Sequence, residues 1–332
     1  MATTIYEAIR SSLIALLKGR WPAFDVFGEG IDKTQEEGQT ELEDYIYLDI
    51  IPSGNQSAGR GYTDRTILVD AAIHTKGESN LEYRVRALLE NPNPTAAIYC
   101  KTGECEIRIT AQAQNDAEAQ TMCRAYAKKF YDLLGDAVYD EDVAGLEETV
   151  VHTLQANGLT IATAESCTGG MIAQRLTSVS GASEVFGYGF VTYWEQAKAK
   201  LVGVDPAVIA QYNVVSAPVA AQMALGAAAA SGADIALSVT GVAGPTGGDE
   251  VRPVGTVYLG AARDGVAYVK KLFVTRPDRA LVRARAAQAA LELGLRLAQG
   301  KVPEGTQALT AAQQSDDAAL AALDRAFVRE TS

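Results

Sequence analysis

The chain has 332 residues, of which 48% are hydrophobic and 21% are charged, and its formal net charge at neutral pH is −12. This composition is typical of a soluble globular protein with a sizeable core, and the length suggests roughly two domains, or three small ones. The acidic balance argues against a nucleic-acid-binding protein, which would carry a basic stripe, and no apolar run approaches the ~18 residues that span a bilayer.

The termini and cysteines favour a cytoplasmic protein. Residues 1–21 lack the basic start and cleavage site of a secretory signal, and we expect an amphipathic helix there. The cysteines show neither a CxxC pair nor metal-finger spacing, which favours reduced thiols: Cys100, Cys105, Cys123 and Cys167. With only two histidines, His74 and His152, and no clustered ligands, we expect neither a metal site nor a cofactor.

Residues 1–88 predict a small α+β unit. A helix is expected over residues 4–18 and strands over residues 45–51 and 65–73, joined by a flexible loop. Three polar residues are interpreted as strand positions rather than a site: Asp64, Asp70 and His74. The segment resembles the beginning of phage tail-terminator-type proteins, which implies an assembly role. The resembling stretches are residues 8–17, 49–54, 59–64 and 72–76.

Residues 89–144 predict a second small α+β unit. Prolines at 92 and 94 act as a breaker before two strands, over residues 97–100 and 104–111. One helix is expected over residues 116–134, with Asn115 as its cap. We expect the three cysteines of this segment to pack under the helix as core thiols rather than reactive ones.

Residues 145–300 alternate between helical and strand patterns, which predicts a three-layer α/β/α sandwich. Helices are expected after Gly169, around Lys198, and over residues 146–157, 206–212, 217–231 and 278–298. Strands are expected over residues 159–164, 185–193, 233–239, 254–262 and 266–274. The tail, residues 301–332, is interpreted as an appendage with at most one amphipathic helix, over residues 317–329.

A strand-to-helix turn follows the strand over residues 159–164 and places Ser166 just before Gly169 and Gly170. Ligands bind at such strand ends in open α/β sheets. The glycines permit close approach, and free N–H groups at a helix start attract anions. The turn therefore predicts a site for a phosphate or an oxyanion beside Ser166, and an ordinary tight turn is the alternative.

Two further strand ends carry polar residues. Tyr193 and Lys198 follow the second strand, and Thr240 follows the third, just before a glycine-rich loop over residues 241–248. Two glycine loops that face one another make a crevice for a phosphorylated ligand. We therefore expect Ser166, Lys198 and Thr240 to share one cleft.

A nucleophilic Ser166 needs a base, and no histidine follows His152. Lysine is the remaining candidate, although its pKa must then fall from about 10.4 to about 7–8. The alternative is that Lys198 and Lys200 are solvated helix positions. Cys167 is a rival nucleophile that also lacks a histidine partner. Thr240 is a possible oxyanion donor or a plain cap, and three arginines are candidate phosphate partners or solvated positions: Arg252, Arg279 and Arg283.

Several motifs occur in one order across residues 146–298. They are ATAESCTGG at 162–170, Tyr193 with Lys198, LVGV at 201–204, VVS at 214–216, SVTGVAGP at 238–245 and PVGT at 253–256. Together they resemble the CinA (competence/damage-inducible protein A) C-terminal domain, the nicotinamide-nucleotide amidohydrolase family. Residues 91–142 resemble the KH-like middle domain of full-length members of that family.

The resemblance implies hydrolysis of the carboxamide of nicotinamide mononucleotide to nicotinate mononucleotide and ammonia, without metal or cofactor. It implies that Ser166 is the nucleophile and Lys198 the base, and that Tyr193 and Thr240 support the site. Substrate binding is implied for Glu165, Thr168, Gly169, Gly170, Gly241, Gly244, Gly247, Gly248 and Arg279. The expected partner is a pyridine nucleotide, with no nucleic acid or membrane, and a homo-oligomer such as a dimer is expected.

The sequence departs from the family in three places. Trp194, Glu195 and Gln196 replace small and polar residues, and Thr246 and residues 251–252 differ in the second loop. These changes affect substrate fit more than catalysis. The N-terminal molybdopterin-binding-like domain of full-length members is not recognised, so its pyrophosphatase activity is not expected. The alternative function is a non-enzymatic phage-tail assembly protein that retains a nucleotide-binding domain.

Overall fold

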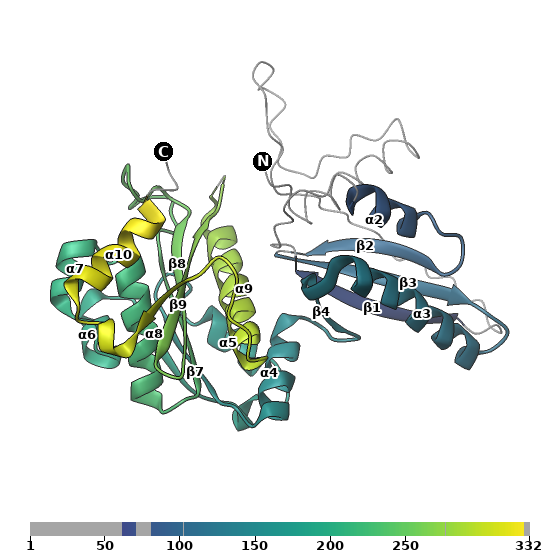
Figure 1. Cartoon of the computed structure of the whole chain (residues 1–332), viewed down its shortest axis with the longest axis horizontal. Coiled ribbons are helices and arrows are strands. Elements are labelled where there is room, and N and C mark those ends of the chain that lie inside the picture. Colours follow the sequence, from purple (N-terminus) through teal and green to yellow (C-terminus); the bar gives the residue numbers. More distant parts are fainter. Residues whose placement is uncertain (1–61, 71–80, 102, 276, 329–332) are drawn as a thin grey trace, which may run out of the picture. The chain divides into compact units, whose positions relative to one another are not determined.

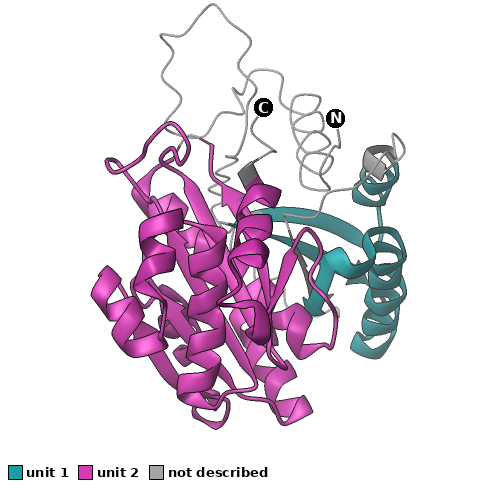
Figure 2. Cartoon of the chain, turned by 60° about the vertical axis from the view of Figure 1, so that its left-hand side comes forward, with its two compact units in different colours: residues 1–144 teal, residues 145–332 magenta. Residues whose placement is uncertain are grey.

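The computed structural model describes residues 62–70, 81–101, 103–275 and 277–328 (Figure 1). The helix expected over residues 4–18, the strand expected over residues 45–51 and His74 lie outside these ranges. The chain divides into two compact units, residues 1–144 and 145–332, which are coloured separately in Figure 2.

The first unit contains a four-stranded antiparallel sheet in the order β2-β3-β1-β4. Its strands are β1 (Tyr62–Asp70), β2 (Thr95–Lys101), β3 (Glu104–Gln112) and β4 (Val138–Glu141). Its helices are α2 (Leu81–Leu89) and α3 (Asp116–Leu134). Asn115 caps α3 as predicted, because its side chain accepts a hydrogen bond from the Glu118 N–H. Cys105 and Cys123 are buried core thiols, also as predicted.

Strand β1 corrects the expected division of this half of the chain. Residues 65–73 were expected to form a strand of a separate amino-terminal unit. The strand covers Tyr62–Asp70 instead and pairs along its whole length with β3, so it is a central strand of the first unit's sheet. The pairing of β1 with β3 could not be predicted from the sequence, because the partner residues are about forty positions apart and local patterns carry no information about such pairings.

The second unit is built on a six-stranded mixed sheet in the order β10-β9-β8-β7-β5-β6. Strand β5 is parallel to β6 and β7, and the other neighbours are antiparallel. The strands are β5 (Ile161–Glu165), β6 (Phe186–Val191), β7 (Ile235–Gly241), β8 (Thr256–Arg263), β9 (Val266–Phe273) and β10 (Gln307–Thr310).

Helices cover both faces of this sheet, which confirms the predicted three-layer sandwich (Figure 1). One layer contains α4 (Leu146–Asn157), α5 (Met171–Thr177) and α9 (Arg279–Ala298). The other contains α6 (Glu195–Val202), α7 (Pro206–Tyr212), α8 (Ala217–Ser231) and α10 (Asp317–Val328). No helix within the described ranges is long and apolar enough to cross a bilayer.

Gly226 brings α6 and α8 into close contact. A Cβ atom at this position would overlap the carbonyl oxygen of Val202, the last residue of α6. Because glycine has no side chain, the end of α6 can lie directly on α8. This contact fixes the helix that carries Lys198.

The tail is part of the second unit, and its interpretation as an appendage is wrong. Strand β10 pairs antiparallel with β9 at the edge of the sheet, and α10 packs against α8. Four of its apolar side chains are buried in the main core: Leu309, Leu320, Leu323 and Phe327. The short β10 exposes all but one of its residues, so the sequence offers no strand periodicity to recognise there.

Candidate active site

Ser166 and Lys198 form a hydrogen-bonded pair at the carboxyl end of β5. Lys198 Nζ lies 3.0 Å from Ser166 Oγ, and it donates a second hydrogen bond to the carbonyl oxygen of Thr192 at 2.7 Å. Ser166 follows directly after β5, whereas Lys198 projects from α6 with its side chain fully buried. Two elements that are separate in the sequence therefore place an amine against a hydroxyl.

Burial of Lys198 suits the amine to act as a base. Loss of water around the ammonium group lowers the pKa of Lys198 to about 8, although the neighbouring Cys167 and Glu195 oppose the shift. A lysine with such a pKa is partly neutral near pH 7 and can accept a proton. Of the two lysines on α6, Lys200 is exposed, so the solvated interpretation is correct for Lys200 and wrong for Lys198.

Cys167 is poorly placed to compete as the nucleophile. Its side chain is buried, and burial raises the pKa of the thiol to about 11, although Lys198 and Arg283 partly offset the increase. The thiolate is the nucleophilic form of cysteine, and at neutral pH almost none is present at this pKa. The hydroxyl of Ser166 is the group that contacts the amine.

Glu165 caps helix α5 and does not face a ligand, contrary to the expected substrate role. Its buried carboxylate accepts hydrogen bonds from the N–H groups of Gly170, Ile172 and Ala173, at 2.9–3.1 Å. The predicted anion site at the start of α5 is therefore already occupied by a side-chain carboxylate. Gly169 and Gly170 adopt φ values of 58° and 95°, so the tight turn itself requires glycine.

We expect replacement of Glu165 to destabilise the second unit. Glu165→Gln keeps the shape but removes the charge and turns one end of the group into a donor that faces amide N–H groups. A loss of about 1–3 kcal/mol in the free energy of unfolding is expected, measured by urea denaturation. The control is Glu250→Gln, because Glu250 is exposed in the second glycine loop. Equal stability of the two variants would contradict a capping role.

Arg279 and Tyr193 connect two sides of the site. Arg279 donates to the Tyr193 hydroxyl at 3.0 Å and to the Gly244 carbonyl oxygen at 2.8 Å. Thr240 instead donates its hydroxyl proton to the carbonyl oxygen of Val214 at 2.8 Å. Because that proton is already used, Thr240 is not positioned as an oxyanion donor, which corrects one of its two expected roles.

The other two arginines bind main-chain carbonyls. Arg283 donates to the carbonyl oxygens of Cys167 and Thr168, at 3.1 and 2.8 Å, and so supports the turn after Ser166. Arg252 donates to those of Val215 and Tyr212, both at 2.7 Å. Arg279 also donates to a main-chain carbonyl, but it is the one of these three arginines that lines the pocket beside Ser166, and so it is the best placed of them to meet a phosphate.

A pocket of about 540 Å³ opens above the Ser166–Lys198 pair. Six of the expected site residues line it: Ser166, Lys198, Tyr193, Thr240, Gly241 and Arg279. Seven others do not: Glu165, Thr168, Gly169, Gly170, Gly244, Gly247 and Gly248. The remaining lining residues are Cys167, Trp194, Glu195, Gln196, Val214, Val215 and Ala243.

Several glycines of the second loop serve the backbone rather than a ligand. A Cβ atom at Gly241 would lie 2.8 Å from Val257 Cγ2, and one at Gly248 would lie 2.7 Å from the Val254 nitrogen. A Cβ atom at Gly244 would overlap the Val254 side chain. The loop therefore needs glycine at these positions because its outgoing and returning segments pass close to one another.

Main-chain donors remain beside Ser166. The N–H groups from Gly169 to Ala173 all donate within the turn or to Glu165. No main-chain acceptor is found for the N–H groups of Cys167 and Thr168 in the part of the chain that the structure describes, although the Cys167 N–H interacts with its own thiol. The described residues also contain no group of three or more His, Cys, Asp or Glu side chains arranged to hold a metal ion.

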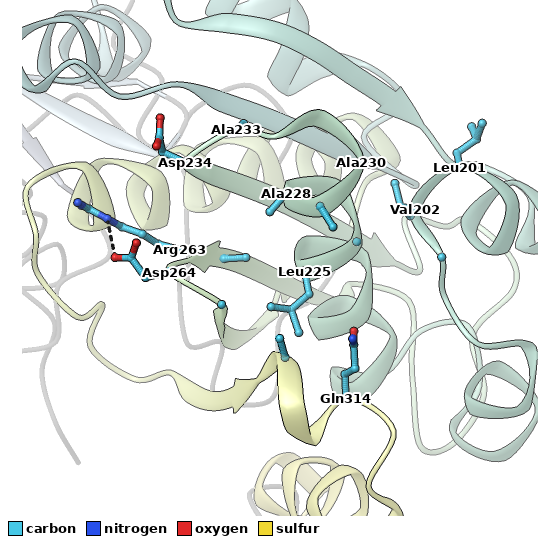
Figure 3. A pocket seen from close by; sticks show the side chains of 16 residues that line it. Leu201, Val202, Leu225, Ala228, Ala230, Ala233, Asp234, Arg263, Asp264 and Gln314 are labelled. Carbon is cyan, nitrogen blue, oxygen red and sulfur yellow. Dashed lines mark ion pairs between the residues drawn. The ribbon is translucent and has the colours of Figure 1, made fainter.

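A larger pocket, of about 740 Å³, contains no comparable reactive set (Figure 3). It is lined by residues next to the start of β7 and the turn between β8 and β9, at the other end of the strands from Ser166. Its charged groups already have partners. Asp234 accepts from Thr160, and Arg263 pairs with Asp264 at 3.3 Å.

Comparisons with known proteins agree with the motifs. The profile of the CinA C-terminal domain matches residues 143–298, and that of the damage-inducible protein CinA KH domain matches residues 74–139. A CinA-like protein from Kosmotoga olearia is 44% identical over 217 residues, which are 65% of this chain and 52% of that protein. A putative competence-damage inducible protein from Thermoanaerobacter sp. is 43% identical over the same shares. The chain spans about half the length of the curated relatives it matches.

Solved structures of similar proteins cover a little under half of the chain. A competence/damage inducible protein from Agrobacterium tumefaciens is 39% identical, with coverage of 46% of this chain and 96% of that one, and a TM-score of 0.44. A CinA superfamily protein from Escherichia coli is 37% identical, with coverage of 46% and 88% and a TM-score of 0.44.

Proposed function

Because this chain belongs to the CinA family, we propose that its second unit hydrolyses the carboxamide of nicotinamide mononucleotide, a pyridine nucleotide, to nicotinate mononucleotide and ammonia. The observation that carries the proposal is the 3.0 Å contact between a buried lysine amine and the Ser166 hydroxyl at the base of a pocket. Serine–lysine pairs are a known variant of the serine–histidine–aspartate arrangement.

The reaction begins with proton transfer. The neutral Lys198 amine accepts the proton of Ser166 Oγ as the oxygen bonds to the carboxamide carbon, and the carbonyl oxygen becomes an oxyanion. The N–H groups of Cys167 and Thr168, which follow Ser166 and have no main-chain acceptor among the described residues, are the proposed donors that stabilise that charge. The carbonyl of Thr192 holds Nζ in place throughout, because it accepts one of the amine hydrogens.

Collapse of the intermediate breaks the carbon–nitrogen bond. The Lys198 ammonium gives its proton to the departing nitrogen, which leaves as ammonia and leaves nicotinate bound to Ser166 as an ester. Lys198, neutral again, then takes a proton from water as the water attacks the ester. The products are the free carboxylate and the regenerated serine, so one water is consumed for each ammonia released.

The rest of the pocket suits a pyridine nucleotide. Arg279 places a guanidinium where a phosphate can enter, and the fork geometry of arginine favours phosphate oxygens. Trp194 and Tyr193 are 74% and 54% exposed beside the pocket, so their rings are free to contact a cationic pyridinium. Trp194 and Glu195 belong to the stretch that stands where the family has small and polar residues, and they are the positions at which we expect substrate fit to differ.

The test is ammonia release from nicotinamide mononucleotide by the purified full chain. We expect turnover that is unchanged by EDTA, because the proposed nucleophile and base are both side chains. Loss of activity with EDTA and its recovery with a divalent ion would refute the serine–lysine mechanism. Absence of turnover from a folded protein would favour a nucleotide-binding or structural module in a phage-tail assembly protein.

A further inference from the structure

One wall of the active-site pocket is held in place from outside the catalytic turn. We define the α7 wall as helix α7 together with residues 213–215; of these, Val214 and Val215 line the pocket. The wall lies between α6 and α8 in the sequence and belongs to no strand, and the sheet reaches it through the bond from Thr240 of β7 to the Val214 carbonyl oxygen. Side chains from other parts of the second unit form hydrogen bonds with main-chain groups at both ends of the wall and hold it in position.

Arg252 forms hydrogen bonds with the carboxyl end of the α7 wall. Its Nε donates to the Val215 carbonyl oxygen and its Nη2 to the Tyr212 carbonyl oxygen, both at 2.7 Å. Its side chain is 18% exposed, so the two bonds are largely shielded from water. The arginine comes from the loop between β7 and β8, and it ties that loop to the wall.

Gln222 forms a hydrogen bond with the amino end of the same wall. This α8 side chain is 4% exposed, and its Oε1 accepts from the N–H of Asp205, the cap of α7, at 3.0 Å. Its Nε2 donates to the carbonyl oxygen of Gln314 at 2.7 Å. Gln314 lies in the carboxy-terminal segment, beyond the residues 143–298 matched by the family profile. A buried amide thus joins that segment to the start of α7.

The carboxy-terminal segment also lies near Arg252, which bonds the other end of the α7 wall. Burial raises the pKa of Asp324 on α10, and the charges of Arg252 and Lys271 oppose that shift, which places the carboxyl near both cations. Phe327 packs edge-on against Tyr258, with ring centres 5.9 Å apart, and Tyr258 pairs with Thr240 across β7 and β8. Thr240 in turn bonds the Val214 carbonyl.

We propose that Arg252 and Gln222 are positioning residues of the active site, and that Gln222 couples the carboxy-terminal segment to the α7 wall. Together they hold the two ends of the α7 wall, so residues outside the matched family region help to shape the pocket. The kinetic consequences of this proposal rest on the proposed amidohydrolase function, whereas its structural consequences do not.

The kinetic test compares two arginines. Arg252→Gln removes both charge-assisted bonds to the wall, and we expect KM for nicotinamide mononucleotide to rise roughly 10- to 100-fold while kcat changes by less than about threefold. Arg252→Lys should restore part of the loss. The matched control is Arg263→Gln, because Arg263 also donates to a main-chain carbonyl and pairs with an aspartate, but at the other end of the strands. An unchanged KM in Arg252→Gln would overturn the proposal.

The second test needs no substrate. Amide hydrogen exchange of residues 205–216 should become roughly tenfold faster in Arg252→Gln and in Gln222→Glu, but not in Arg263→Gln. Gln222→Glu retains an acceptor for Asp205, but it replaces the donor to Gln314 with a buried carboxylate oxygen that faces the Gln314 carbonyl oxygen. Unchanged exchange in both variants would refute the positioning role even if the enzyme is active. If the wild type shows no turnover, the proposed function fails, and the exchange result still decides this inference.

Discussion

Ser166→Ala is expected to abolish ammonia release from nicotinamide mononucleotide, with kcat lowered by roughly 10⁴- to 10⁶-fold. Of the two hydrogen-bond partners that Lys198 Nζ has among the described residues, the Ser166 hydroxyl is the one that can form a covalent bond to the carboxamide carbon. Removal of it leaves the pocket and any oxyanion donors intact but leaves no nucleophile. The measurement is steady-state ammonia release, with mass spectrometry of the wild type mixed with substrate to detect the acyl-serine.

Cys167→Ala is the matched control for this prediction. Cys167 is the adjacent residue and the rival nucleophile, but its thiol stays protonated at neutral pH because burial raises its pKa to about 11. We expect Cys167→Ala to keep activity within about tenfold of the wild type. Full activity in Ser166→Ala together with loss in Cys167→Ala would assign the covalent step to the thiol and reject the proposed mechanism.

Most of the second unit's fold could be predicted because its local signals are strong. Helix α8 is capped by Ser216 just before its first residue and is followed by Gly232, and both residue types are standard signals for the ends of a helix. Strand β7 is buried at nearly every position, as its apolar run predicts. Strand β10 could not be predicted, because one inward Leu309 in four residues is too little pattern. Its membership of the sheet depends on the distant strand β9.

The candidate site, like the fold, was predictable in part. Residue types and strand ends pointed to Ser166 and Lys198, but they could not show that Lys198 is buried while Lys200 is exposed. Only the packing of α6 on α8 decides that. The part of Thr192 could not be foreseen either, because its main-chain carbonyl holds the amine and every residue has such a group.

Glu165 shows why a motif overstates a binding site. The residue stands within a glycine turn that resembles a ligand loop, yet its carboxylate fills the helix start that an anion would otherwise use. The sequence alone cannot separate these two uses, because both need an acidic or anionic group at the same donors. The structure separates them, and Arg279, which lines the pocket, remains the proposed phosphate contact.

Lys198→Met should lower kcat roughly 10³- to 10⁴-fold, because the variant keeps the unbranched stem of the side chain and removes the base. For the wild type, kcat/KM should rise as pH increases through about 8, the pKa at which the buried amine loses its proton. Lys198→Arg is the control, since a guanidinium keeps the charge but cannot act as a base near neutral pH. Near-normal activity in either variant would show that Lys198 does not accept the proton.

The same lowered pKa has a consequence for stability that is independent of catalysis. Below pH 8 the lysine is protonated in the folded and unfolded states, and the folded state carries the full cost of a buried ammonium. Between about 8 and the ordinary value of 10.5, only the unfolded chain keeps the proton, so the free energy of unfolding should rise with pH across that window. Lys198→Met lacks this group, and the wild type should therefore gain stability relative to it from pH 8 to 10. Urea denaturation of both proteins measures the difference, and a constant difference would mean that the amine is hydrated in the folded protein.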